Sequence, residues 1–184
     1  GRDAVVWLVC HVDTSGAVPA DGWAVAGGGH GDDALRGVAV HHMQLSSGVS
    51  DFDVVAVGYF TQNSTFGDSV LVSPSQIAGT YMKPLVWKVS SLGTTRWVIG
   101  GEGEGDIQLN DVAIDQGRNE FIIVGTLKGN ASSNAITLGT ANSRASSGFV
   151  LGESNPARAM LIWRVHADGY TLWATRGGNN KGWL

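Results

Sequence analysis

The chain has 184 residues, of which 43% are hydrophobic and 15% charged, so it is long and apolar enough to bury a core. Its net charge of -4, with 12 scattered Lys and Arg residues, argues against a nucleic-acid-binding protein, because affinity for phosphate needs clustered basic side chains. No run of about 18 apolar residues is present, so we expect no membrane insertion.

Composition favours an all-β fold. The 27 glycines and 7 tryptophans are typical of short strands joined by tight turns rather than of helices. The chain enters strand-like sequence at residues 1–7, without an initiator Met or signal peptide, and stops at Leu184 just after a glycine pair. We therefore expect a segment of a longer repeating polypeptide.

An apolar strand, a glycine turn, a Trp and a glycine pair recur three times along the chain. The copies occupy Val9–Gly28, Val86–Gly101 and Ile162–Gly178. Val12, Val89 and Val165 mark spacings of 77 and 76 residues. A long fixed period of β-type sequence predicts stacked or radially arranged units.

Each copy reads as a β-hairpin, because apolar and polar side chains alternate before the turn and the chain returns through the Trp. The third copy has the clearest turn signal, since Asp168-Gly169 supports the positive φ angles of tight turns. After the glycine pairs we expect further strands, namely Val38–Val40 with Val54–Gly58, and Val112–Ile114 with Phe121–Gly125. Shorter apolar stretches follow at Phe66–Val72 and Ala135–Leu138.

A unit of four principal antiparallel strands, with a short fifth, describes a β-propeller blade. The predicted units are 1–76, 77–157 and 158–184, the last being only a first hairpin. Two and a half blades cannot close a ring, so a partial propeller or an open blade stack is expected. The insertions at 73–82 and 140–157 are interpreted as surface loops.

The repeated tryptophans are candidate core residues. Trp87 and Trp163 align with Cys10, the single cysteine, which we expect to be a buried apolar filler rather than a reactive thiol. A second set consists of Trp23, Trp97 and Trp173. Their recurrence favours packing between blades over the stacking of sugars.

The middle copy resembles the bacterial β-propeller repeat called SBBP, found in large secreted and surface proteins. The matching segments are Val86–Val89, Gly93, Trp97, Gly100–Asp106, Asp111–Asp115 and Val124–Thr126, with Val57–Phe60 and Thr65–Gly67 before them. The first copy departs from this pattern at Cys10 and by three more residues between Gly16 and Trp23, and His41 stands at the counterpart of Asp115. The resemblance implies an extracellular scaffold and supplies no catalytic residues.

Two N-glycosylation sequons occur at equivalent places, because Asn63 and Asn130 each lie five residues beyond a glycine, Gly58 or Gly125. Chance sequons are common, but repetition at one turn favours N-linked glycans on both. The sugars would then project from one side of the assembly.

An acidic glycine loop offers a candidate calcium site through Glu102, Glu104 and Asp106, and its counterpart contains Asp32 and Asp33. Carboxylate oxygens suit Ca²⁺, but such a site needs six to eight oxygens and the loop matches no known calcium motif. A solvated turn is the simpler interpretation.

No catalytic residues are predicted. His41 and His42 are adjacent on a strand and should point to opposite faces, and no nucleophile elbow, HExxH motif or ordered triad is present. The glycines at 101–105 are not followed by a helix, so they do not indicate a nucleotide site.

These features together predict a non-enzymatic extracellular or cell-surface scaffold, structural or adhesive, that assembles through blade contacts. Its partners would be further blades of the same chain or identical subunits, in a filament or coat. The alternative is a glycan- or protein-binding module that acts through the loops 73–82 and 140–157. A third interpretation is a sensor or hydrolase propeller whose active residues lie outside this segment.

Overall fold

The computed structural model describes residues 3–8, 22–44, 50–71, 81–103, 105–129, 136–140, 149–151 and 158–177. This part of the chain is all-β, as predicted, and every strand pairing in it is antiparallel. None of the described residues forms a helix that could cross a lipid bilayer.

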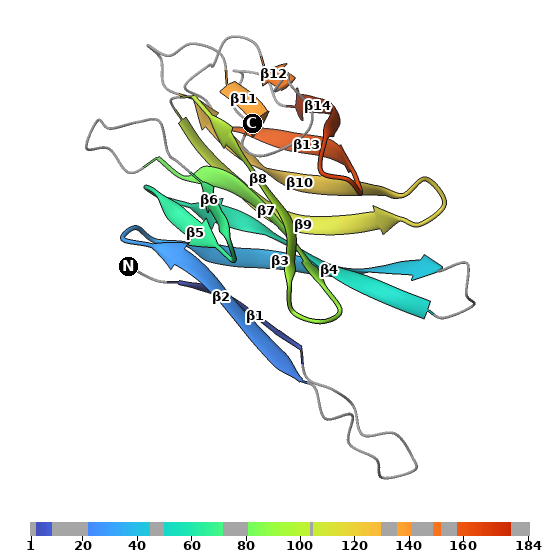
Figure 1. Ribbon diagram of the computed structural model, residues 1–184. Coiled ribbons are helices and arrows are strands. Elements are labelled where there is room, and N and C mark those ends of the chain that lie inside the picture. Colours follow the sequence, from blue (N-terminus) through green and yellow to red (C-terminus); the bar gives the residue numbers. More distant parts are fainter. Residues whose placement is uncertain are drawn as a thin grey trace.

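The strands are β1 (Ala4–Leu8), β2 (Trp23–Gly29), β3 (Ala34–Gln44), β4 (Ser50–Phe60), β5 (Ser64–Phe66), β6 (Ser69–Leu71), β7 (Lys83–Ser90), β8 (Thr95–Glu102), β9 (Gly105–Asp115), β10 (Glu120–Gly129), β11 (Ile136–Thr140), β12 (Phe149–Leu151), β13 (Arg158–His166) and β14 (Thr171–Gly177). They form three sheets, which we name by their order in the stack. The first sheet has the order β1-β2-β5-β6, the middle sheet β12-β11-β8-β7-β4-β3 and the last sheet β14-β13-β10-β9 (Figure 1).

The repeat is visible in the order of pairing. β1, β7 and β13 are equivalent, as are β2, β8 and β14, while β3 and β4 correspond to β9 and β10, and β5 and β6 to β11 and β12. The predicted hairpins β7–β8 and β13–β14 are confirmed. Stacked, similar sheets of this kind are the structural form of a long sequence period.

The sheets interlock along the chain. The β5–β6 hairpin follows β4 of the middle sheet in sequence but pairs with β2 of the first sheet. The β11–β12 hairpin follows β10 of the last sheet and pairs with β8 of the middle sheet. The β5–β6 and β11–β12 hairpins therefore each pair with the sheet before the one that contains the strand preceding them. As a result, the predicted unit boundaries at residues 76 and 157 do not separate the sheets.

The sequence alignment of the first copy was wrong by three residues. Trp7 lies opposite Ala24 in the same register that places Trp87 opposite Val98 and Trp163 opposite Ala174. Trp7, and not Cys10, is thus the counterpart of the core tryptophans. Cys10 lies outside the described residues.

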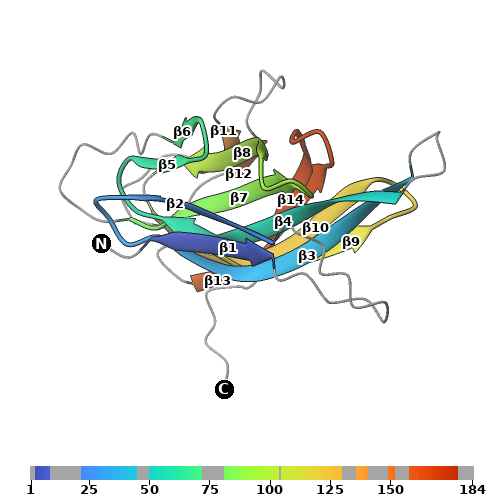
Figure 2. The same cartoon turned by 60° about the horizontal axis from the view of Figure 1, so that its bottom comes forward.

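Side chains of the middle sheet alternate between two cores, as the two-residue period of a strand requires. Leu85, Trp87 and Val89 pack toward the first sheet, together with Phe66 of β5. Val55, Val57 and Val86 pack toward the last sheet. The middle sheet is therefore buried on both faces, and Figures 1 and 2 both place the first-sheet strand β6 beside β8 of the middle sheet.

Several local predictions differ from the structure. The stretch from Phe66 is part of a hairpin, β5–β6, and not one strand, and the predicted loop 140–157 contains the strand β12. The acidic glycine loop is also shorter than expected, because β8 continues to Glu102 and β9 already begins at Gly105. Long-range pairing with a neighbouring strand extends each of these elements beyond its local pattern.

Candidate assembly interface

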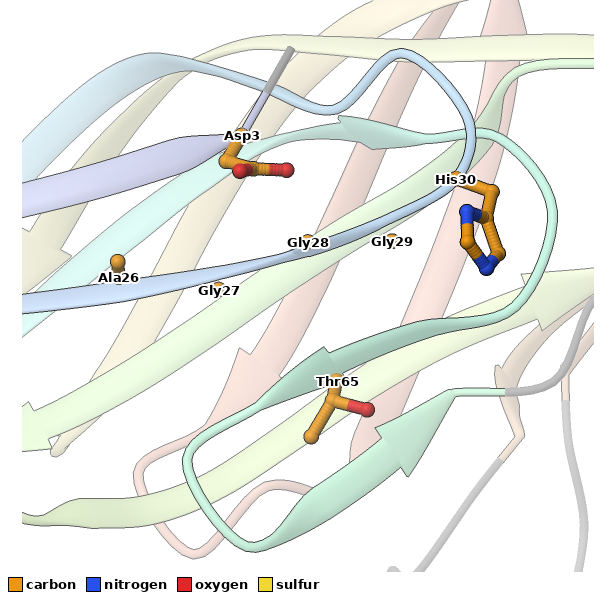
Figure 3. Close-up of a pocket in the computed structure, with 7 residues that line it drawn as sticks. All are labelled: Asp3, Ala26, Gly27, Gly28, Gly29, His30 and Thr65. Carbon is orange, nitrogen blue, oxygen red and sulfur yellow. The ribbon is translucent and has the colours of Figure 1, made fainter. Parts of the chain in front are cut away.

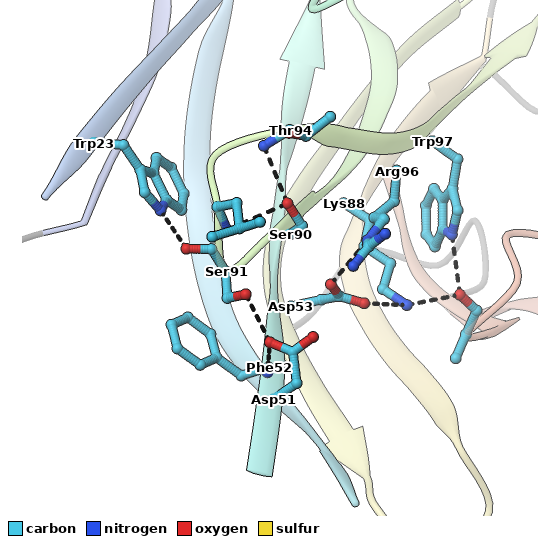
Figure 4. Close-up of polar contacts among 12 residues, drawn as sticks. Trp23, Asp51, Phe52, Asp53, Lys88, Ser90, Ser91, Thr94, Arg96 and Trp97 are labelled. Carbon is cyan, nitrogen blue, oxygen red and sulfur yellow. Dashed lines mark hydrogen bonds and ion pairs between the residues drawn. The ribbon is translucent and has the colours of Figure 1, made fainter. Parts of the chain in front are cut away.

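A tryptophan of one sheet is held against the hairpin turn of the next. Trp97 of β8 donates a hydrogen bond from its indole Nε1 to the carbonyl oxygen of Ala167, at 3.0 Å (Figure 4). Gly169 in the same turn has a φ of +91°, and a Cβ there would lie 3.0 Å from the Trp97 ring. The turn therefore needs glycine both for its backbone conformation and for the approach of the indole.

The contact is repeated between the first and middle sheets. Trp23 of β2 donates from Nε1 to the carbonyl oxygen of Ser91, at 2.7 Å (Figure 4). Gly93 has a φ of +79°, and a Cβ there would lie 2.9 Å from the Trp23 ring. The β7–β8 and β13–β14 hairpins close with the same backbone hydrogen bonds, so their turns have the same form.

A buried ion pair supports the contact between Trp97 and Ala167 and was not predicted from the sequence. Lys88 Nζ lies 2.9 Å from Asp53 and also donates to the carbonyl oxygen of Ala167, at 3.1 Å. Arg96 Nε adds a second ionic contact to Asp53, at 3.2 Å. Ala167 thus accepts hydrogen bonds from both Lys88 and Trp97. The signal that could have indicated this pair is its recurrence, because Arg164 and Glu120 form an ion pair at the equivalent positions of the last sheet.

The other repeated tryptophans are fully buried. Trp87 Nε1 donates to the Thr95 hydroxyl and Trp163 Nε1 to the Thr171 hydroxyl, both at 3.0 Å. Each bond stays within one hairpin of its own sheet. These tryptophans stabilise the sheet itself, because a buried indole N–H requires an acceptor.

Trp173 differs from Trp23 and Trp97, because its side chain is 37% exposed. The same face of the last sheet exposes Ile122 at 38%, Val124 at 41% and Ile162 at 39%, whereas their counterparts Val55, Val57 and Val86 in the middle sheet are all 0% exposed. Equivalent residues are therefore buried where another described sheet covers them and exposed where none does. Exposed apolar side chains gathered on one face are typical of interaction surfaces.

The structure describes one of the two sequon asparagines. Asn63 is exposed between β4 and β5. Asn130 lies outside the described residues, as do most of the two insertions, from which only Tyr81, Met82, Thr140 and β12 are described. Glycosylation at both sites stays a prediction.

The candidate calcium ligands do not converge in the part of the chain that the structure describes, where no group of three His, Cys, Asp or Glu side chains could hold a metal ion. Asp33 is buried and accepts hydrogen bonds from Gly29 N, Thr61 N and the Ser64 hydroxyl. Asp106 accepts one from Met82 N. Asp32 and Glu102 are exposed, and Glu104 lies outside the described residues.

Asp33 has a structural role that the sequence did not suggest. Its carboxylate connects the end of β2, the segment after β4 and the first residue of β5. It thereby holds the start of the β5–β6 hairpin against the first sheet. Hydrogen bonds to a charged acceptor are among the stronger polar contacts in proteins.

The adjacent histidines point to opposite faces, as expected: His41 is buried and His42 exposed. Burial lowers the pKa of His41 below its ordinary value, and the charge of Lys88 lowers it further. Its ring makes a T-shaped contact with Phe121, with centroids 5.4 Å apart. The hydroxyl of Ser91 donates to Asp51 and lowers the pKa of that carboxyl group.

A shallow pocket lies at the glycine-rich end of β2 (Figure 3). Its lining consists of Asp3, Ala26, Gly27, Gly28, Gly29, His30 and Thr65. The pocket is open to solvent, and Figure 3 shows the three polar side chains around the glycine backbone rather than converging on one point. We assign no chemistry to it.

Comparison with known proteins adds no relative. No protein-family model, curated protein or solved structure matches the chain. The resemblance to the SBBP repeat therefore stays a prediction.

Proposed function

We propose that this chain is a non-enzymatic structural scaffold, in which its sheets stack as propeller-like blades against further sheets of the same repeat. The further sheets belong to the same polypeptide or to identical subunits. The observation that carries the proposal is the contrast between Trp97, which is held by the next sheet, and Trp173, which is exposed at the equivalent position.

The exposed face of the last sheet has the donors that a further sheet would satisfy. Arg164 and Trp173 correspond to Lys88 and Trp97, the two residues that donate to the carbonyl oxygen of Ala167. A further sheet would present the equivalent turn carbonyl, beside a glycine of positive φ. It would also cover Ile122, Val124 and Ile162, each worth about 1 kcal/mol or more when its remaining surface is buried.

The opposite end of the stack offers a different surface. Val38 and Val40 of β3 are 63% and 44% exposed, whereas of their counterparts in β9 Val112 is 6% exposed and Ile114 is partly buried. β9 lies against β3 and β4 of the middle sheet. Two unlike ends make the contact heterologous, so repeated association would produce a ring if it closes and a filament if it does not.

The proposed surroundings follow from the sequence. We place the scaffold outside the cell or on the cell surface, with N-linked glycans on Asn63 and Asn130. Exposure of Asn63 supports the first of these sites. Bound calcium at the acidic turns is the remaining open prediction.

Self-association of the purified chain tests the proposal, by sedimentation velocity over a range of concentrations. We expect the wild-type chain to form larger species, and expect the double variant Ile122→Thr/Ile162→Thr and the single variant Trp173→Ala each to weaken association by about tenfold or more, equivalent to about 1.4 kcal/mol. Threonine keeps the branched shape that suits a strand.

Leu92→Ser is the matched control, because Leu92 is an apolar residue that is 82% exposed on the β7–β8 turn, away from this face. It should associate like the wild type. A wild-type chain that stays monomeric at its highest soluble concentration, or variants of the last sheet that associate like the control, would contradict the proposal.

A further inference from the structure

The last sheet differs from the other two at its outer edge. β5 pairs with β2 in the first sheet, and β11 pairs with β8 in the middle sheet. β14 is the counterpart of β2 and β8, and no described strand pairs with its outer edge. An unpaired edge presents backbone N–H and C=O groups to an incoming strand.

The paired edges of β2 and β8 share one feature. The strand that pairs with each of them places an apolar side chain directly opposite a glycine. Phe66 lies opposite Gly27, and Leu138 lies opposite Gly101. A Cβ on Gly27 would lie 2.2 Å from the Phe66 ring, and one on Gly101 would lie 2.8 Å from the carbonyl oxygen of Thr137. β5 and β11 therefore need a glycine at this position of the strands that they pair with, β2 and β8.

The incoming strands also share a short sequence, Thr65-Phe66-Gly67 and Thr137-Leu138-Gly139. Both final glycines have a positive φ, +60° at Gly67 and +86° at Gly139. A Cβ on them would lie 2.2 Å from Thr95 Oγ1 and 2.5 Å from Thr171 Oγ1 respectively. These are the hydroxyl groups that accept the indole hydrogen bonds of the buried tryptophans.

Gly177 of β14 occupies the receiving position. It lies opposite Met160 in the register that places Gly27 opposite Ala4. A Cβ on Gly177 would meet only Met160 Cε, at 3.5 Å, and Met160 is itself 61% exposed. The space that Phe66 and Leu138 fill in the other sheets is therefore open beside Gly177 within the described structure.

We propose that the outer edge of β14 binds an extended strand with the sequence Thr-(Phe or Leu)-Gly, supplied by a further unit of this repeat. Backbone hydrogen bonds would add the strand to the sheet, and its apolar side chain would sit over Gly177 against Met160, as in the strand-addition mode of peptide recognition. The inference rests on the proposed function for the source of the strand, but the binding site is separate from the Trp173 face.

A peptide from the chain itself tests the site. A fluorescein-labelled peptide with the sequence of residues 62–72 is titrated with the full 184-residue chain and followed by fluorescence anisotropy. We expect saturable binding, weakened at least tenfold by Gly177→Val in the chain or by Phe66→Asp in the peptide. Amide hydrogen exchange should show new protection at residues 174–177 when the peptide is bound.

Two variants separate the possible failures. Gly117→Val lies in an exposed turn and should bind the peptide like the wild type. Trp173→Ala should also keep peptide binding while its self-association weakens, because the peptide does not need the Trp173 face. Absent peptide binding, unchanged binding by a folded Gly177→Val chain, or protection elsewhere than β14 would overturn the inference. A chain that binds the peptide but never self-associates would instead overturn only the proposed function.

Discussion

The indole Nε1 of Trp97 donates to the carbonyl oxygen of Ala167, 70 residues further along the chain and in the next sheet. The Trp23 and Ser91 pair repeats this bond one unit earlier, with a separation of 68 residues. A directional bond at the same place in two interfaces fixes how one sheet sits on the next. Sheet stacking in this protein is therefore specified by particular residues as well as by apolar area.

The turn glycine at this contact should be sensitive to substitution. Gly169→Ala places a side chain at a φ of +91° and against the Trp97 ring, so we expect the free energy of unfolding to fall by about 1–3 kcal/mol. Urea denaturation measures the change. Gly117→Ala in an exposed turn is the control and should stay within about 0.5 kcal/mol of the wild type. Equal stability of the two variants would refute the close packing of Trp97 on the turn.

Removal of Lys88 should be costly, because its partner Asp53 is only 2% exposed. We expect Lys88→Met to lower the free energy of unfolding by about 3 kcal/mol, since a buried carboxylate would keep only the partly exposed Arg96. The double variant Lys88→Met/Asp53→Asn should recover part of the loss. Arg118→Met breaks the exposed pair with Asp115 and should cost about 0–1 kcal/mol. A loss for Lys88→Met no larger than for Arg118→Met would argue against the buried pair.

Equivalent glycines in two sheets should respond differently to the same substitution. Gly101→Ala places a Cβ 2.8 Å from Pro84 and from the carbonyl oxygen of Thr137, so we expect a loss of about 2 kcal/mol. Gly177→Ala meets only Met160 Cε and should be close to neutral. Thermal or urea unfolding of the two variants makes the comparison. Similar losses at both positions would mean that the β14 edge is already occupied.

Stability should depend on the protonation of His41. Its pKa is lowered in the folded state, whereas in the unfolded chain it is about 6.5. The unfolded state therefore takes up the proton first, so the contribution of His41 is complete above about pH 6.5 and is lost as the pH falls below it. We expect the free energy of unfolding to fall less between neutral and mildly acidic pH in His41→Gln than in the wild type. Parallel pH profiles would show that His41 does not contribute.

Glycan occupancy is checked by intact-protein and glycopeptide mass spectrometry of the native material. We expect sugars on Asn63 and Asn130, because the two sequons follow equivalent strands, and Asn63 is exposed. Asn119 is also exposed but lies outside a sequon, so it serves as the internal control and should be bare. Bare Asn63 and Asn130 would remove the glycan part of the proposal.

The all-β fold and most strands could be predicted because a strand side chain alternates between faces every two residues, and this pattern is local. The hairpins at residues 85–99 and 161–175 follow from such patterns and from their turn glycines. The register of the first copy was also recoverable, since Val5–Val9 reads like Leu85–Val89 around a central Trp. Cys10 was aligned with the core tryptophans instead, because Gly16 was matched to the turn glycines of the later copies.

Local sequence by itself determined the class, the repeat and the positions of the principal strands. Only the tertiary structure decided which sheet each hairpin joins, because the β5–β6 hairpin has two sheets within reach and pairs with the earlier one, where Gly27 leaves space for Phe66. It also decided the burial of Lys88, whose partner Asp53 lies 35 residues away. Such choices depend on contacts between distant segments, and these contacts have no periodic signal in the sequence.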